Sequence, residues 1–199
     1  ALVSDAGTPL VSDPGFKLVR AAVEAGFAVT CLPGASAVLA GLTLSGLPCE
    51  SFHFAGFLPP KEGERRRRLE ALRQVPGTLV LFEAPGRVAA TVQAMAEVLG
   101  DRRGAVAREL TKLHEEVVRG GLGELAARLQ NVEPRGEYVI LVGPGVAAAV
   151  GEDDVRAALR AAMTDRPLRS AVDEVATGLG IARKRVYELA LALKRDATP

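Results

Sequence analysis

The sequence contains no tryptophan, and aromatic residues make up only 4% of its 199 positions. A core with few aromatic side chains has to be filled by smaller ones, and Ala, Val, Leu and Gly are abundant in this chain. Small side chains of this kind suit helices that pack closely against a parallel β-sheet. Together with 25% charged residues, the 48% hydrophobic content predicts a globular protein.

Further absences narrow the class of protein. Cys31 and Cys49 are too few for a disulfide framework or a cysteine metal site, and each is expected to be a small buried residue in a reducing compartment. His53 and His114 lack metal-ligand spacing, so no metal is expected. The sequence has no recognisable signal peptide and no apolar run long enough to span a bilayer, which predicts a cytoplasmic protein without membrane contact.

The net charge of +1 gives no indication of nucleic-acid binding for the chain as a whole, but two stretches are strongly basic. The first stretch consists of Arg65, Arg66, Arg67 and Arg68. Such a run on a helix contacts RNA or DNA phosphates, or else it is a solvated face paired with neighbouring glutamates. The second stretch consists of Arg183, Lys184 and Arg185. These residues begin the second helix of a helix–glycine turn–helix pattern. This pattern is interpreted either as a helix-turn-helix that binds nucleic acid or as a plain helical hairpin.

The spacing of apolar residues and helix breakers predicts alternating strands and helices in the first part of the chain. Strands are expected over 1–4 and 27–32, and helices over 13–26 and 35–44. This alternation is typical of a doubly wound parallel sheet. Further strands are expected over 52–57, 78–82, 104–108, 115–120 and 137–142, and helices over 61–72, 87–99, 123–129, 152–163 and 168–193, with a linker over 146–151.

Two glycine-containing turns are candidates for a ligand site. SDAGTP (4–9) follows the first expected strand, where Asp5 can accept hydrogen bonds and Gly7 permits close approach of a ligand to the backbone. LPGASA (32–37) follows the next strand and leads into a helix N-terminus, which favours polar or negative groups. An ordinary turn and a helix cap by Ser36 are the simpler interpretations. Neither turn has the GxGxxG or P-loop pattern of nucleotide phosphate sites.

A third candidate is RELTKLHEE (108–116), which is densely charged and follows an apolar strand. Burial lowers the pKa of a lysine and raises that of a carboxylate, and either shift produces a general base. Lys112 and Glu109 are therefore the candidate catalytic residues. A solvated loop with local ion pairs is the alternative.

Several motifs occur in an order that resembles the tetrapyrrole methylase family of S-adenosyl-L-methionine-dependent enzymes. They are SDAGTPLVSDPG, LPGASAV, GLP, GFLPPK, RRRR, LVLFEAPGR, VARELTKLHEE and RGEYVILVGP. The likeness extends from Ala1 to about Pro144, and the tail is similar to a helical domain found in some members. The resemblance is strongest to members that methylate the 2′-hydroxyl of a cytidine in the decoding region of 16S rRNA.

The resemblance implies an α/β, two-lobed class III methyltransferase fold that is truncated at its N-terminus, because the family's first Pro/Gly-rich loop has no counterpart here. It implies a remnant of the N-terminal lobe over 1–47, a C-terminal lobe over 48–145 and a helix-turn-helix-like tail domain over 152–199. S-adenosyl-L-methionine would bind in the cleft between the lobes. The implied cofactor-binding residues are Asp5, Thr8, Ser36, Ala37, Phe82, Ala107 and the backbone around Tyr138.

The resemblance also implies a reaction and partners. The ribose 2′-oxygen would displace the sulfonium methyl group, with Lys112 or Glu109 taking the hydroxyl proton, while the two basic stretches hold RNA phosphates. The partners would be 16S rRNA or the small ribosomal subunit, and a second copy of the chain in a homodimer. A tetrapyrrole methyltransferase and a non-catalytic helix-turn-helix nucleic-acid-binding protein remain the alternatives.

Overall fold

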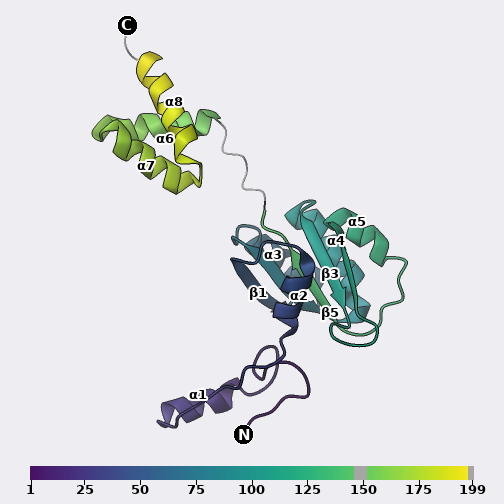
Figure 1. The fold of residues 1–199 in the computed structure, drawn as a ribbon. Helices are drawn as coiled ribbons and strands as arrows, with labels where there is room; N and C mark the ends of the chain where they lie inside the picture. Colours follow the sequence, from purple (N-terminus) through teal and green to yellow (C-terminus); the bar gives the residue numbers. More distant parts are fainter. Residues whose placement is uncertain (146–151, 197–199) are drawn as a thin grey trace. The chain divides into compact units, whose positions relative to one another are not determined.

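The computed structural model describes residues 1–145 and 152–196. The chain divides into two compact units, Ala1–Gly145 and Val146–Pro199, and Figure 1 shows the elements of each. The expected linker over 146–151 lies outside the described residues.

The first unit is built on a five-stranded mixed sheet within the described residues, with the strand order β1-β2-β5-β3-β4. Its strands are β1 (Phe52–Phe57), β2 (Thr78–Glu83), β3 (Arg103–Arg108), β4 (Glu116–Gly121) and β5 (Tyr138–Val142). Strands β1 and β2 pair in parallel, and the other described pairs are antiparallel. The five strands predicted over 52–142 are thus confirmed. The sheet of the described residues is mixed, and the parallel sheet expected from the alternation in the first part of the chain does not form there.

Helices cover both faces of this sheet (Figure 1). On one face, α3 (Glu62–Leu72), α4 (Val88–Leu99) and α5 (Leu122–Leu129) enclose the core with Leu81 and Ile140. On the other face, α2 (Ala37–Ser45) packs on the alternate strand residues, among them Val80 and Leu141. Strand residues alternate between the two faces because successive side chains of a strand point in opposite directions.

Glycine lets α2 approach the sheet closely. A Cβ atom at Gly41 would lie 3.4 Å from Leu141 and 3.1 Å from a methyl group of Val139, and the latter distance is tighter than ordinary van der Waals contact. This contact supports the expectation that small side chains allow tight packing of helix on sheet.

The first 36 residues differ from the predicted pattern. They contain α1 (Phe16–Glu24), none of whose residues is buried, and no strand forms over 1–4 or 27–32. The two predicted strands are therefore wrong. An extended segment becomes a β-strand only when a neighbour satisfies its backbone N–H and C=O groups, and no described segment pairs with these two. The expected burial of Cys31 and Cys49 is also wrong, because both are exposed.

The second unit consists of α6 (Glu152–Asp165), α7 (Leu168–Leu179) and α8 (Arg183–Asp196). Its apolar core includes Leu159, Val172 and Val186 from the three helices. Gly180 ends α7 in the left-handed conformation with φ 63°, which turns the chain into α8. The predicted helix–glycine turn–helix pattern is confirmed. None of the helices over 1–145 and 152–196 is long and apolar enough to cross a membrane.

Candidate functional site

A cavity of about 440 Å³ in the first unit is lined by segments that lie far apart in the sequence. Its lining residues are 6–8, 11–13, 36–38, Phe57, 82–85 and 136–139. A cavity of this size falls in the range that small-molecule and cofactor sites occupy. The two glycine-containing turns singled out in the sequence therefore do meet at one cavity, although neither follows a strand.

A direct hydrogen bond joins these two turns. The Thr8 hydroxyl donates a hydrogen bond of 3.2 Å to the backbone carbonyl of Ala35, which precedes the N-cap residue of α2. Ser36 is the N-cap of α2, and its hydroxyl accepts the backbone N–H of Leu39 at 3.4 Å. The first turn of α2 therefore lines the cavity with its N-terminus, where backbone N–H groups favour polar or negative ligand groups.

Five of the seven predicted cofactor residues line the cavity, namely Thr8, Ser36, Ala37, Phe82 and Tyr138. Asp5 is exposed and is not among the lining residues, although Ala6 and Gly7 of the same turn are. Ala107 is fully buried in β3, where it packs in the cluster beneath α2. Neither Asp5 nor Ala107 contributes to the cavity wall in this structure.

Two aromatic side chains give the cavity an apolar side. Phe57 and Phe82 both line it, and their ring centroids lie 5.8 Å apart in an edge-to-face arrangement. Phe54 packs against Phe82 in the same manner at 4.8 Å. Phe57 was not singled out in the sequence, although it belongs to the GFLPPK motif.

The cavity also includes a buried carboxylate that was not predicted. Glu83, at the end of β2, is only 2% exposed. It accepts hydrogen bonds from Arg87 at 2.9 Å, from the Thr91 hydroxyl at 2.7 Å and from the Ala84 N–H at 2.8 Å. Arg87 donates in addition to the Leu58 carbonyl at 2.6 Å. These bonds fix the segments that follow β1 and β2 relative to each other, which indicates a structural role for Glu83.

The candidate catalytic residues Lys112 and Glu109 contact each other beside the cavity. The Lys112 ammonium donates to a carboxylate oxygen of Glu137 at 2.8 Å and of Glu109 at 2.9 Å. Glu137 was not predicted, and it lines the cavity.

The electrostatics of these residues oppose the role of base. The hydrogen bonds to Glu137 and Glu109 raise the pKa of Lys112, and the bond from Lys112 lowers the pKa of Glu109. A protonated lysine accepts no proton, and a carboxylate of lowered pKa is a weaker base. The predicted downward shift of the lysine pKa is therefore wrong in this arrangement.

A second cavity of about 390 Å³ lies next to this cluster. It is lined by Arg108, Glu109, His114, Val132, Glu133, Arg135 and Gly136. Gly136 lines both cavities, so its backbone forms part of the lining of each.

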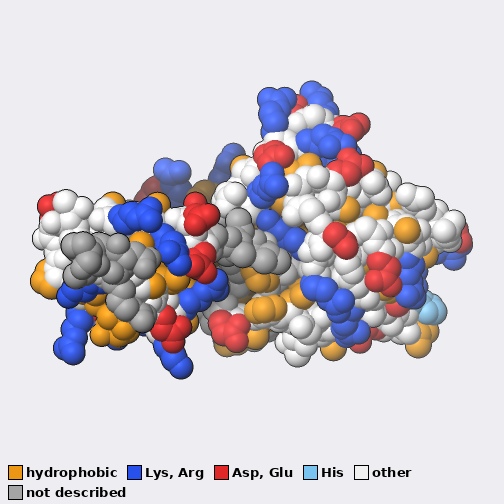
Figure 2. All heavy atoms as spheres, turned by 90° about the horizontal axis from the view of Figure 1, so that it is seen from above, with side chains coloured by type: hydrophobic (Ala, Val, Ile, Leu, Met, Phe, Trp, Pro, Cys, Tyr) orange, Lys and Arg blue, Asp and Glu red, His pale blue; other side chains and the backbone are white. Residues whose placement is uncertain are grey.

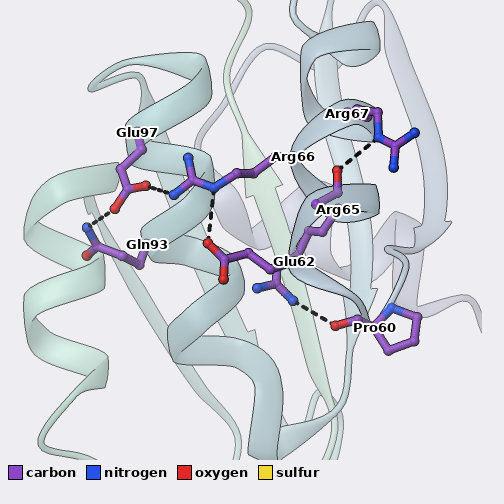
Figure 3. A network of polar contacts seen from close by, with 8 residues as sticks. Pro60, Glu62, Arg65, Arg66, Arg67, Gln93 and Glu97 are labelled. Carbon is purple, nitrogen blue, oxygen red and sulfur yellow. Dashed lines mark hydrogen bonds and ion pairs between the residues drawn. The ribbon is translucent and has the colours of Figure 1, made fainter.

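The run of arginines on α3 is divided between buried or paired positions and exposed ones, and Figure 3 shows the partners of Arg65, Arg66 and Arg67. Arg65 is buried, with 8% of its surface exposed, and donates to the Pro60 carbonyl at 3.2 Å. Arg66 pairs with Glu62 at 3.3 Å and also with Glu97. Arg67 and Arg68 are exposed. The expectation that all four arginines contact RNA is not supported for Arg65, which the protein itself encloses.

At the start of α8, Arg183 forms an ion pair with Asp173 of α7, and this hydrogen bond raises the pKa of Arg183. Lys184 and Arg185 are exposed. On the face that Figure 2 shows, Lys and Arg side chains are scattered among Asp and Glu. Among the described residues, no group of three or more His, Cys, Asp or Glu could hold a metal ion.

Family comparisons match both units of the chain. The family Tetrapyrrole (Corrin/Porphyrin) Methylases matches residues 1–126, and the RsmI C-terminal HTH domain matches residues 149–194.

Curated relatives extend over almost the whole chain. Ribosomal RNA small subunit methyltransferase I of Mesorhizobium japonicum is 47% identical over 196 residues, covering 98% of this chain and 67% of that protein. The protein of the same name from Micromonospora olivasterospora is 48% identical over 204 residues, covering 98% of this chain and 64% of its own length. The chain thus spans about two thirds of the length of these relatives.

Solved structures support the fold. The crystal structure of diphthine synthase aligns with a TM-score of 0.54 at 18% identity, over 69% of this chain and 57% of that one. The methyltransferase CobJ aligns with a TM-score of 0.52 at 20% identity, over 69% of this chain and 62% of that one. At this level of identity the likeness concerns the fold alone, and it confirms the predicted class of α/β fold.

Proposed function

Because the chain belongs to the tetrapyrrole methylase family, we propose that it uses S-adenosyl-L-methionine to methylate the ribose 2′-hydroxyl of a cytidine in 16S rRNA. The observation that carries this proposal is the 47% identity to a ribosomal RNA small subunit methyltransferase I over 98% of the chain. That similarity includes the helical tail, which also matches the RsmI C-terminal HTH domain over 149–194. A methylase acting on a small tetrapyrrole needs no such nucleic-acid-reading pattern.

The cavity of about 440 Å³ is the proposed cofactor site. Phe57 and Phe82 supply aromatic surface for a nucleobase, and the first turn of α2 supplies N–H groups for polar parts of the ligand. The hydrogen bond from Thr8 to Ala35 joins the two turns that form another part of the lining. These residue types fit a nucleoside with a polar tail.

When bound, S-adenosyl-L-methionine supplies a methyl group already activated for displacement. The protein therefore contributes mainly by positioning the acceptor oxygen in line with the methyl group and by excluding water. The cluster of Glu109, Lys112 and Glu137 lies beside the cavity, and its polar groups are proposed to help orient the acceptor.

We further propose 16S rRNA or the small ribosomal subunit as the partner, with a homodimer as the assembly and the cytoplasm as the location. Exposed basic residues are the proposed phosphate contacts, namely Arg67, Arg68, Lys184 and Arg185. Arginine and lysine neutralise phosphates without reading the base sequence.

Two measurements test this function. Calorimetric titration with S-adenosyl-L-methionine is expected to give one site per chain, and Phe82→Ala is expected to weaken binding because it removes aromatic surface. The chain is then incubated with 16S rRNA and the labelled methyl donor, and ribose methylation is mapped by nucleotide. Transfer to a tetrapyrrole instead of RNA would replace the proposed function with the first alternative. RNA binding without affinity for the methyl donor would favour the non-catalytic alternative.

A further inference from the structure

The loop that follows β3 carries Lys112 to a position between two carboxylates. Its ammonium lies 2.9 Å from Glu109 and 2.8 Å from Glu137, which is 25 positions further along the chain. Glu109 and Glu137 are also joined directly. The Glu137 N–H donates to the Glu109 carboxylate at 2.9 Å, and the Glu109 N–H donates to the Glu137 carbonyl at 3.0 Å. The end of β3 is thereby tied to the segment that begins β5.

The backbone at this junction is strained. Glu109 and Thr111 have positive φ angles of 50° and 64°. Residues other than glycine disfavour this left-handed region because they carry a Cβ atom. Such conformations persist where surrounding contacts hold them. The Thr111 conformation is held by its backbone N–H, which donates to the Glu115 carboxylate at 2.7 Å. The Glu109 conformation is held by the contacts of its carboxylate with Lys112 and with the Glu137 N–H.

Gly136 completes the junction. Its φ is 77°, and a Cβ atom there would lie 2.5 Å from a carboxylate oxygen of Glu109. The Glu109 carboxylate therefore occupies the space beside the Gly136 backbone into which a side chain would project. Glu109 thus contacts the segment that lines the cavity of about 440 Å³, which includes Gly136, Glu137 and Tyr138.

From these contacts we propose that Lys112 is a positioning residue that bridges Glu109 and Glu137 and so fixes the wall formed by Gly136, Glu137 and Tyr138. That this wall contacts a methyl donor rests on the function proposed above. The bridge between Glu109 and Glu137 rests only on the contacts just described. The ammonium acts as a cation with two acceptors. The raised pKa of Lys112 agrees with this, because the charged form is the one that bridges.

Two substitutions separate positioning from proton transfer. Lys112→Met keeps a long unbranched side chain but removes the charge. Lys112→Arg keeps the charge and several donors but cannot accept a proton at neutral pH. Rescue by arginine is therefore expected for a bridge and is excluded for a base.

The first readout is amide hydrogen exchange of the full chain, which requires no ligand. In Lys112→Met the Glu109 and Glu137 amides are expected to exchange on the order of tenfold faster, whereas Lys112→Arg stays near the wild-type rate. Unchanged exchange in Lys112→Met would overturn the proposal. A matched control is Lys61→Met, since Lys61 forms an ion pair with Glu64 at 3.5 Å with the same three-residue spacing as Lys112 and Glu109. This control is expected to leave the Glu137 amide unchanged.

The second readout is the affinity for S-adenosyl-L-methionine and the kinetics of transfer. Lys112→Met is expected to raise Kd and KM for the methyl donor by about tenfold with a smaller loss in kcat, and Lys112→Arg is expected to restore both. Equal loss of kcat in the two variants with normal exchange would assign Lys112 as a base instead. If the wild-type chain binds no methyl donor, the proposed function fails, and the exchange data alone still decide the positioning role.

Discussion

Helix α3 carries four consecutive arginines, and α8 begins with Arg183, Lys184 and Arg185, so the two regions are alike in sequence. They differ in what their side chains contact. On α3, Arg65 is buried and Arg66 pairs with two glutamates (Figure 3), whereas on α8 Arg183 pairs with one aspartate and its two neighbours are exposed. Successive residues of a helix point in different directions, so four in a row cannot all face one ligand. A basic run in a sequence therefore overstates the charge available for binding.

The largest effect that would test this contrast is on stability. Arg65→Ala removes a buried guanidinium and its bond to the Pro60 carbonyl, and it is expected to lower the free energy of unfolding by about 2 kcal/mol. Chemical denaturation of the variant measures this change. Lys184→Ala serves as the control and is expected to leave stability unchanged. A fully stable Arg65→Ala protein with weakened RNA binding would show that Arg65 belongs with the exposed residues.

The next effect concerns RNA affinity. Lys184 and Arg185 are exposed at the start of α8, and replacing both by alanine is expected to weaken binding to 16S rRNA by about tenfold at low salt. If each residue contacts one phosphate, the slope of log K against log salt concentration should fall by about 1.4. Fluorescence anisotropy at several salt concentrations measures both quantities. An unchanged slope would remove α8 from the RNA surface.

A smaller effect on RNA affinity should distinguish the exposed Arg68 of α3 from Arg66, which is paired. Arg68→Ala is expected to lower RNA affinity by about threefold without changing stability, because it removes one phosphate contact. Arg66→Ala is expected to have less effect on RNA, since Glu62 and Glu97 already occupy its guanidinium. Both variants are compared in the same binding assay. If Arg66→Ala weakened RNA binding more than Arg68→Ala, the assignment of Arg66 as paired and Arg68 as a phosphate contact would be wrong.

The smallest effect is a pH dependence. Hydrogen bonds from Gln93 and Arg66 lower the pKa of Glu97 in the folded state. A lowered folded-state pKa stabilises the protein above the ordinary value of 4.5, and this contribution is lost as the pH falls through the folded pKa. The difference in Tm between wild type and Arg66→Gln should therefore be constant from pH 7 to about 5 and shrink below about 4.5. Thermal denaturation across this range measures it, and a difference that grew on acidification would contradict the pairing.

Much of the first unit could be predicted from the sequence because local patterns determine it. The strand Tyr138–Val142 is an unbroken apolar run that is fully buried, and α2 begins at its serine cap. Pairing partners could not be predicted in the same way. The segments 1–4 and 27–32 have the composition of strands, but a strand also needs a neighbour, and composition does not say whether one is present.

For the candidate site, too, features carried by local motifs could be predicted, and features that depend on distant segments could not. Thr8, Ser36, Ala37 and Phe82 could be placed at the cavity because short motifs carry them. The electrostatic state of Lys112 could not be predicted, because its pKa depends first on Glu137, which lies in another segment. Glu83 was missed although it lies in the LVLFEAP motif, since a carboxylate at a strand end gives no local sign of burial.

The backbone of Gly136 lines two cavities at once. A ligand in one cavity that moved this backbone would change the lining of the other cavity as well. Binding at the two cavities would then be thermodynamically linked, and the influence of each ligand on the other would be equal in both directions.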